Sequence, residues 1–413
     1  MKLHASRVYT IMGFMVALAN STMFTTYAVY QIIALGLNPF QLLLVGAVLE
    51  VTVLLFEGIT GVIADTYSRR LSVIIGMFVL GFGFILEGSA IWLGTGSSVI
   101  PAFLWLLIAQ LIFGVGATFV SGADTAWIVD EVGEEHAGGL FLEAKRIGLY
   151  GTLIGIGLSV GLSALAPNLP YVIGGLMYAV LGGFLLIYMK ETKFTAMKRT
   201  ADTSHWQNMK GTWVLGAQMI RRHFVLVLML IVTLFSGAAS EGYDRLWQAH
   251  FIMDIGFPQS IQFTAAAWFG IIAVLSTFLS LFAMGIAQRR LDMCNEHVVL
   301  RGMIVLTIAR IAAILSVALS SNFIWVLVSV LILEVIRTMS GPMYDTWLNL
   351  NIESRSRATV LSMMSQSDAL GQTVGGPLVG WVGNRFSVRA SLVVAAVLLS
   401  PVLVLFSRAL RKR

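Results

Sequence analysis

The sequence predicts an all-α integral membrane protein with twelve transmembrane helices, arranged as two pseudo-symmetric six-helix bundles with both termini in the cytoplasm. Three observations predict this fold. Of the 413 residues, 57% are hydrophobic and only 12% are charged, whereas soluble domains carry about 25% charged residues. The chain contains twelve long apolar stretches, and twelve spans of roughly 20 residues need about 240 residues. Lys and Arg gather between alternate stretches.

The apolar stretches form two sets of six. The first set covers 9–35, 40–63, 71–93, 101–127, 144–166 and 169–189, and the second covers 223–250, 259–287, 297–319, 322–345, 358–383 and 387–408. The stretches lack the alternating pattern of barrel strands, so helices are the remaining way to satisfy the backbone in lipid. The first stretch has no small-residue cleavage site, and we expect it to be retained as a helix.

Positive charge orients the helices. With both termini in the cytoplasm, 22 of the 27 Lys and Arg residues lie on the cytoplasmic side and two lie in outer loops. This asymmetry predicts the orientation and explains the net charge of +6 without a nucleic-acid partner. Cys294 is the single cysteine, which excludes a disulfide scaffold.

We expect three parts: an N-terminal bundle over 1–190, a cytoplasmic linker over 191–222 and a C-terminal bundle over 223–413. Apolar linker residues follow helical spacing at Trp206, Met209, Trp213, Ala217 and Ile220. This spacing predicts an amphipathic helix on the inner leaflet, and a disordered tether is the alternative.

The two halves look like one unit used twice. Equivalent residues recur at an offset of 219 or 220 positions: Arg69-Arg70-Leu71 with Arg289-Arg290-Leu291, Ser121-Gly122 with Ser340-Gly341, Trp127 with Trp347, and Gly151 and Gly155 with Gly371 and Gly375. Parallel six-helix repeats are typical of transporters that bind substrate where their halves meet.

The loop after the second stretch carries a motif, which reads Gly61-Val62-Ile63-Ala64-Asp65-Thr66-Tyr67-Ser68-Arg69-Arg70. It resembles the signature of the major facilitator superfamily, Gly-x-Leu-Ala-Asp-Arg-x-Gly-Arg-Lys, with departures at Thr66 and Ser68. Asp65 and Arg69 are four residues apart and can pair across one helical turn. We expect a cytoplasmic gate formed by Gly61, Asp65, Arg69 and Arg70, although Arg70 is explained more simply as a residue that holds the topology.

Within this superfamily the chain is similar to bacterial drug:proton antiporters, including tetracycline and macrolide efflux relatives. The similarity rests on residues 241–247, 121–124 and 357–362. It implies export coupled to proton entry. Gln110 stands where these antiporters often carry Arg, and Ile156 stands where their glycine-rich motif has Pro. Both departures bear on the proton-antiport part of the resemblance rather than on export.

Intramembrane carboxylates are the candidates for proton coupling, because a charge in hydrocarbon persists mainly where it faces a cavity or a partner. Glu241 and Asp244 share one face of the seventh stretch with Arg245. Glu241 can pair with Arg245 and leave Asp244 for a ligand or a proton. Glu50 and Glu57, seven residues apart in the second stretch, are the further candidates.

Other intramembrane charges have simpler explanations. Glu334 and Arg337 can pair within the tenth stretch. Glu87 and Arg310 lie on helices that are peripheral in the superfamily, so we expect them to form structural pairs.

Aromatic, amide and charged side chains mark the expected substrate cavity, with candidates Asn20, Tyr27, Tyr30, Gln31, Gln110, Arg245, Tyr344, Trp347 and Asp368. This mixture suits a bulky amphipathic or cationic compound. The six histidines show no ligand spacing and no phosphate-binding Gly-x-x-x-x-Gly-Lys motif is present, so we expect no metal, no cofactor and no direct use of ATP.

These observations predict a secondary active exporter of lipophilic or cationic small molecules, working by proton antiport and alternating access. We expect a multi-pass monomer in the plasma membrane whose partners are its small-molecule substrate, protons and the lipid bilayer. An importer or facilitator of a small metabolite is the first alternative, and a membrane sensor or partner-binding protein that does not transport is the second. No catalytic residue set is visible, so an enzyme is not expected.

Overall fold

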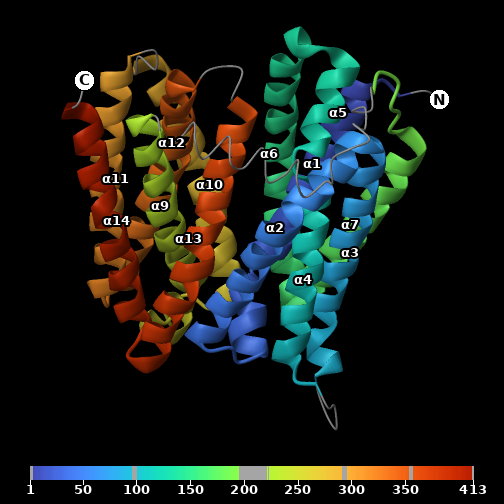
Figure 1. Ribbon diagram of the computed structural model, residues 1–413. Helices are drawn as coiled ribbons and strands as arrows, with labels where there is room; N and C mark the ends of the chain where they lie inside the picture. The colour runs from blue at the N-terminus through green and yellow to red at the C-terminus, as the bar shows by residue number, and fades with distance from the viewer. Residues whose placement is uncertain are drawn as a thin grey trace. The chain divides into compact units, whose positions relative to one another are not determined.

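All regular elements are helices in the computed structural model, which describes residues 3–94, 100–194, 221, 223–290, 295–352 and 357–411 (Figure 1). The first half contains α1 (Ala5–Phe24), η1 (Val29–Ala34), α2 (Pro39–Thr66), α3 (Arg69–Leu93), α4 (Ala102–Val120), α5 (Ala123–Val132), α6 (Glu134–Leu165) and α7 (Leu169–Tyr188). The second half contains α9 (Phe224–His250), η2 (Phe251–Ile255), α10 (Ala265–Arg290), α11 (Glu296–Leu319), α12 (Phe323–Asn351), α13 (Arg357–Arg385) and α14 (Val388–Arg411). The predicted amphipathic helix at 206–220 lies outside the described residues.

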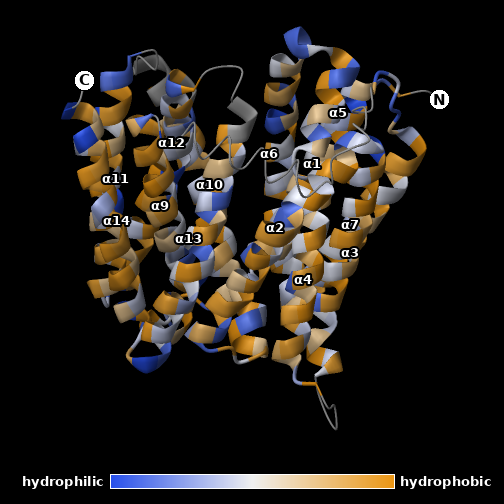
Figure 2. Ribbon diagram, viewed as in Figure 1, coloured by the Kyte–Doolittle hydropathy of each residue, from blue (hydrophilic) through white to orange (hydrophobic). Residues whose placement is uncertain are grey.

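The helices have the lengths and surfaces of membrane spans. Eleven helices or consecutive helix pairs in the described part of the chain are long and apolar enough to cross a bilayer. The twelfth predicted span is α13, which has 29 residues but carries several polar side chains. Large apolar side chains stay exposed, such as Leu165 at 78% and Leu319 at 70%, and Figure 2 shows hydrophobic residues along the helix lengths. The chain is therefore an α-helical, multi-pass membrane protein.

Several helix boundaries differ from the predicted ones, and two of the differences have a clear cause. The stretch 101–127 forms two helices, because Gly122 adopts a φ of 73° between α4 and α5, a conformation that favours glycine. The helix predicted to begin at 144 begins at Glu134. Polar residues continue this helix before its apolar part, so hydropathy alone misses its first turns.

Contacts divide the chain into two compact units. The N-terminal unit comprises 1–37, 51–203 and 263–270, and the C-terminal unit comprises 38–50, 204–262 and 271–413. The first half of α2 thus belongs to the C-terminal unit. Glycines on α13 explain this packing, since a Cβ added to Gly380 would lie 3.1 Å from both Phe40 Cα and Leu43 Cβ.

The internal repeat is visible in equivalent glycine contacts of the two units. A Cβ added to Gly151 on α6 would lie 2.5 Å from the carbonyl oxygen of Phe14 on α1. A Cβ added to Gly371 on α13 would overlap the carbonyl oxygen of Leu234 on α9. Both the glycines and their partners are 220 positions apart in the sequence. Each unit therefore uses the same small residue to bring one helix pair into close backbone contact.

This packing predicts opposite effects for two alanine substitutions on α6. Gly151→Ala forces a methyl group against a backbone oxygen, and we expect it to lower the free energy of unfolding by about 1 to 3 kcal/mol. Gly157→Ala meets nothing within 4 Å among the described residues, so it should leave stability unchanged or raise it, because Ala is the better helix former. Thermal unfolding of both purified variants in detergent measures the difference. Equal melting temperatures would show that α1 and α6 are not closely packed at Gly151.

Candidate functional site

The C-terminal unit contains a pocket of about 280 Å³. Side chains from α9, α11, α12, α13 and α14 line it: Val232, Thr233, Ser236, Ser240, Met303, Thr307, Arg310, Arg337, Ser340, Gly341, Tyr344, Asp368, Leu399, Val402 and Phe406. Known small-molecule pockets start at roughly 300 Å³, so this cavity suits a small organic molecule rather than a bulky one.

Arg337 is one of two arginines in the pocket, and it is already paired. Its Nη1 donates a hydrogen bond of 2.7 Å to Asp244 Oδ1, and its side chain is 53% exposed. Among the described ion pairs Arg337 therefore joins α12 to α9 through Asp244, whereas the sequence predicted a pair with Glu334 on its own helix.

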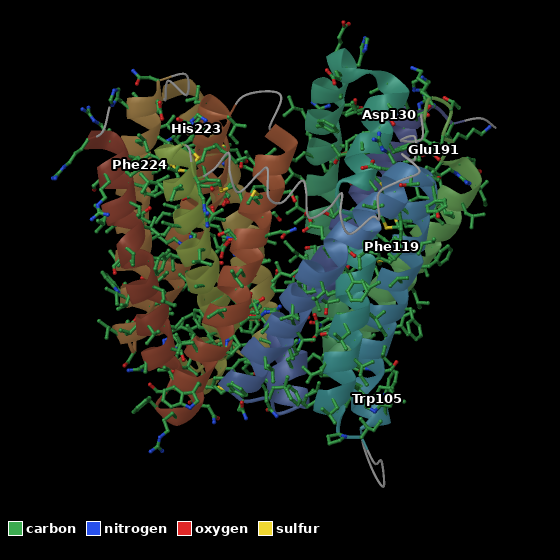
Figure 3. All side chains as sticks on the ribbon, viewed as in Figure 1. Trp105, Phe119, Asp130, Glu191, His223 and Phe224 are labelled. Carbon is green, nitrogen blue, oxygen red and sulfur yellow. The ribbon has the colours of Figure 1, made fainter. Side chains whose placement is uncertain are left out.

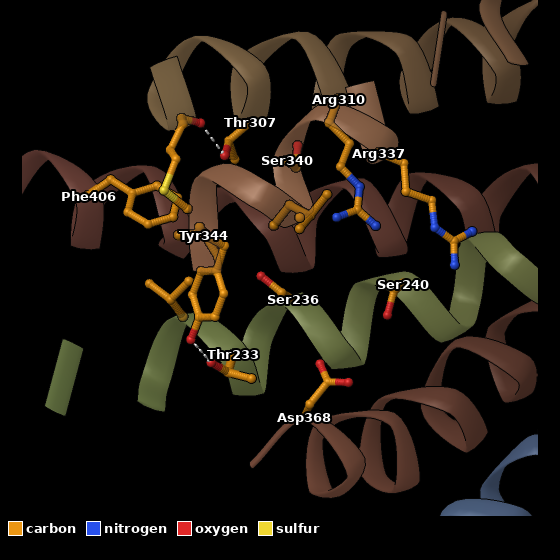
Figure 4. A pocket seen from close by; sticks show the side chains of 15 residues that line it. Thr233, Ser236, Ser240, Thr307, Arg310, Arg337, Ser340, Tyr344, Asp368 and Phe406 are labelled. Carbon is orange, nitrogen blue, oxygen red and sulfur yellow. Dashed lines mark hydrogen bonds between the residues drawn. The ribbon is translucent and has the colours of Figure 1, made fainter. Parts of the chain in front are cut away.

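Arg310 is the second arginine, and it enters the pocket from α11. A guanidinium group carries five N–H donors, yet the described residues offer that of Arg310 no hydrogen bond and no ion pair. Figure 4 shows the guanidinium groups of Arg310 and Arg337 on the same side of the pocket. The predicted structural pair of Arg310 is not found among the described residues; its side chain instead faces the cavity.

Asp368 supplies a negative charge to the same cavity. Its Oδ2 accepts a hydrogen bond of 2.8 Å from Gln372 Nε2, one turn further along α13. Tyr344 and Thr233 join their hydroxyl groups at 2.6 Å. Phe406 lies away from the arginines in Figure 4 and belongs to the apolar part of the lining. The pocket thus combines cationic, anionic and apolar surfaces.

Glu241 and Arg245 form a pair deeper in the C-terminal unit. Arg245 Nε donates a hydrogen bond of 3.0 Å to Glu241 Oε1, and the Glu241 side chain is 7% exposed. A Cβ added to Gly46 on α2 would overlap Glu241 Oε1. Gly46 therefore makes room for this buried pair, a requirement that the spacing on α9 could not reveal.

Three of the predicted cavity residues surround Glu87 in the N-terminal unit instead. Glu87 is 1% exposed, and its two carboxylate oxygens accept hydrogen bonds from Gln31 Nε2 at 3.1 Å and Gln110 Nε2 at 2.9 Å. The Tyr30 hydroxyl donates to the Glu87 backbone oxygen at 2.7 Å. These side chains form a buried polar cluster that joins η1, α3 and α4.

The remaining predicted cavity residues also lie away from the described pocket, with the exception of Tyr344 and Asp368. Asn20 Oδ1 accepts a hydrogen bond of 2.8 Å from the Tyr178 hydroxyl, and Tyr27 is buried. Trp347 is fully buried, and its Nε1 donates to Glu296 Oε1 at 3.2 Å. Trp347 therefore belongs to the core of the C-terminal unit.

The predicted gate motif forms an ion-pair cluster in the N-terminal unit. Arg69 Nη2 lies 3.2 Å from Asp65 Oδ1, while Arg69 Nη1 pairs with Asp130 and donates to the Ala126 oxygen at 3.2 Å. Arg70 donates from Nε to the Met189 oxygen at 2.5 Å. Arg69 thus has two carboxylate partners, one within the motif and one from α5.

Glu191 completes this end of the unit. Its Oε1 accepts the Arg69 backbone N–H at 2.8 Å, and its Oε2 accepts the Ser68 hydroxyl at 2.5 Å. Ser68 itself accepts the Leu71 N–H as the N-cap of α3. Figure 3 places Glu191 at the same end of the unit as Asp130 and far from Trp105. The negative charge of Glu191 lies at the N-terminus of α3, where it interacts favourably with the positive end of the helix dipole.

The other candidates of the second span both lie on α2, but the division into units falls between them. Glu50 is the last residue of the α2 segment in the C-terminal unit, whereas Glu57 belongs to the N-terminal unit. A Cβ added to Gly61 would meet nothing within 4 Å in the described part of the chain. Close packing inside its own unit therefore does not require a glycine there.

Sequence reasoning missed Asp130, Glu191 and Gly46. Asp130 and Glu191 carried a usable signal, because acidic residues beside a basic loop are candidate partners for its arginines. Gly46 carried none, since its role depends on which helix lies opposite Glu241.

Comparisons with known proteins agree on the family. The sequence pattern of the Major Facilitator Superfamily matches residues 9–367. The chain is 22% identical over 394 residues to an uncharacterized MFS-type transporter, YxaM, from Bacillus subtilis (strain 168), covering 93% of this chain and 91% of that protein.

Solved structures agree on the fold. The nucleoside transporter NupG is 14% identical, has a TM-score of 0.75 and is matched over 100% of both chains. A POT family transporter in complex with 5-aminolevulinic acid is 11% identical, with a TM-score of 0.72 over 98% of this chain and 96% of that one. A bacterial homolog of the human lysosomal transporter Spinster, inward-facing and occupied, is 13% identical, with a TM-score of 0.70 over 99% and 96%.

Proposed function

The chain belongs to the major facilitator superfamily, and from this membership we propose that it is a secondary active transporter of a small organic zwitterion. The protein is a transporter rather than an enzyme, as its family and relatives indicate. The observation that carries the substrate class is Arg310, whose guanidinium faces the pocket and has no hydrogen-bond or ion-pair partner among the described residues.

The proposed substrate satisfies the charged groups of the pocket. Its anionic group accepts hydrogen bonds from Arg310 and reaches the neighbouring Arg337. Its amine pairs with Asp368, and its carbon skeleton lies against the apolar lining around Phe406. Burying a charged group without a partner is costly, so a molecule with only one charge leaves either Arg310 or Asp368 without a charged partner.

Transport by alternating access is part of the proposal. We place both termini in the cytoplasm and assign the cytoplasmic gate to the cluster of Asp65, Arg69 and Asp130. All three side chains belong to the N-terminal unit, so in this proposal the cluster fixes that unit's side of the gate. Any difference in its energy between two conformations shifts the equilibrium between them.

Export of a lipophilic or cationic drug by proton antiport is the second candidate. Asp368 favours it, because a carboxylate and an apolar wall share one cavity. Glu241, Asp244, Glu57 and Glu50 are then the proton-coupling candidates. The guanidinium group of Arg310, which has no ion-pair partner among the described residues, repels a cation, so the zwitterion is preferred.

A matched set of three probes tests the substrate class: 5-aminolevulinic acid, its methyl ester and its N-acetyl derivative, which are a zwitterion, a cation and an anion on one carbon skeleton. Ligand-induced stabilisation of the purified protein against heat is the measurement. We expect the zwitterion to raise the melting temperature most, the anion less, and the cation not at all. Stabilisation by the cation alone would favour the drug-export candidate.

A further inference from the structure

His250, the last residue of α9, lies between two oxygen atoms in the C-terminal unit. Its ring is 0% exposed. Nδ1 lies 2.8 Å from Asp254 Oδ2, and Nε2 lies 3.0 Å from the backbone oxygen of Val317 on α11. Neither the mechanism of substrate binding nor the gate cluster uses this histidine.

The two contacts determine how many protons the pair holds. A backbone carbonyl oxygen only accepts, so Nε2 carries a hydrogen. A neutral imidazole has one N–H, so Nδ1 then has no hydrogen to donate. An ionised Asp254 also only accepts, and two acceptors at 2.8 Å repel each other. Both contacts are therefore hydrogen bonds only when His250 and Asp254 together hold one additional proton.

The additional proton belongs on the imidazole. Imidazole is a stronger base than a carboxylate. His250 also lies at the C-terminal end of α9, where the helix dipole favours a cation. The arrangement is thus an imidazolium that donates from both nitrogens, one to α11 and one to η2.

Charged residues occur on the helices that pack against α9. Its own helix carries Asp244 and Arg245 one to two turns away, and α11 carries Arg310 two turns before Val317. Arg385 ends α13, and Arg389 near the start of α14 donates to Ser321 at 3.0 Å. On the side that faces α12, the residue after His250 makes an aromatic contact. Phe251 contacts Phe323, with ring centroids 5.6 Å apart.

The η2 turn carries the acidic partner of this contact. It is a π-helical turn, a form that is frequent at functional sites. Gly256 ends it with a φ of 73° and donates its N–H to the Phe251 oxygen at 2.9 Å. Asp254, 24% exposed, is the side chain of η2 that reaches back to His250.

We propose that His250 and Asp254 form a proton-binding site, and that loss of this proton releases the Asp254 carboxylate of η2 from His250. The proton leaves Nδ1 for water, imidazolium becomes neutral imidazole, and no other bond changes. The Nδ1 lone pair then faces the carboxylate, and Asp254 turns toward solvent. A role of this pair as the site of the coupling proton rests on the proposed secondary transport. The contact between Asp254 and His250, called the latch below, does not depend on the substrate.

Nitrogen NMR of the full chain in lipid nanodiscs tests the protonation. With ¹⁵N-histidine labelling, His250→Gln identifies the resonances of His250, and His297→Gln on an exposed site of α11 is the matched control. At neutral pH we expect both His250 nitrogens to show the shift of a protonated nitrogen in the wild type. In Asp254→Asn we expect Nδ1 to lose its proton at the same pH. An unprotonated Nδ1 in the wild type, or no change in Asp254→Asn, overturns the proposal.

Hydrogen exchange tests the latch without any substrate. Asp254→Ala removes the carboxylate that accepts from His250, so amides in residues 251–257 should exchange about 10- to 150-fold faster than in the wild type. Exchange in α14 should be unchanged, which separates latch opening from loss of fold. Equal rates for residues 251–257 in both proteins would show that the pair does not hold η2. Because neither readout depends on ligand binding, failure of the zwitterion test leaves both results interpretable.

Discussion

Replacing Arg310 with Gln should weaken zwitterion binding by about 10- to 150-fold, the value of a lost hydrogen bond to a charged group. The side chain faces the pocket from α11, and the described residues leave its donors available for a ligand. Arg310→Lys keeps the positive charge but loses the planar pair of donors, so we expect intermediate affinity. The dissociation constant of 5-aminolevulinic acid, measured by calorimetry on detergent-purified protein, gives the comparison.

Arg301 provides the matched control for this prediction. It lies on the same helix, is exposed and is absent from the pocket lining. Arg301→Gln should therefore bind the zwitterion like the wild type. If Arg310→Gln and Arg301→Gln have equal affinities, Arg310 does not hold the substrate, whatever the second pocket arginine contributes.

Replacing Arg245 with Met should lower the free energy of unfolding by about 3 to 5 kcal/mol, because a buried ion pair is broken with one charge left behind. Glu241 is nearly inaccessible, and Arg245 Nε is its partner at 3.0 Å. Adding Glu241→Gln to the same protein removes the remaining charge and should restore most of the stability. Denaturant unfolding of the two variants and the wild type measures the effect.

The ion pair of Arg337 and Asp244 is the control, because it is more exposed than the pair of Arg245 and Glu241. Arg337 is 53% exposed, and exposed ion pairs contribute about 0.2 to 1 kcal/mol. Arg337→Met should thus cost far less than Arg245→Met. Equal losses in the two single variants, or no recovery with Glu241→Gln, would mean that Glu241 is not buried as a charge.

The twelve helices could be predicted from the sequence because each span is decided locally. A bilayer requires a continuous run of apolar residues, and a helix satisfies its own backbone within that run. The repeat could also be predicted, because equivalent residues recur at one offset in the sequence. Gly151 and Gly371 occupy equivalent positions in equivalent helices, and small residues are required wherever two such helices meet.

Which side chains meet was decided only by the tertiary structure. Helical spacing paired Asp65 with Arg69 and Glu241 with Arg245, since both pairs lie within one turn of one helix. It could not pair Arg69 with Asp130, nor Arg337 with Asp244. Those partners come from other helices, and their distances depend on how each helix is rotated against its neighbours.

For the same reason, the sequence could not show which polar residues line the candidate site. Composition indicated that amides and aromatics would line a cavity, yet Gln31 and Gln110 are committed to Glu87, while Arg310 faces the pocket. A polar residue in a span must find a partner, and sequence shows only that it needs one. Whether the partner is a neighbouring helix or a substrate follows from the packing of helices that are distant in the chain.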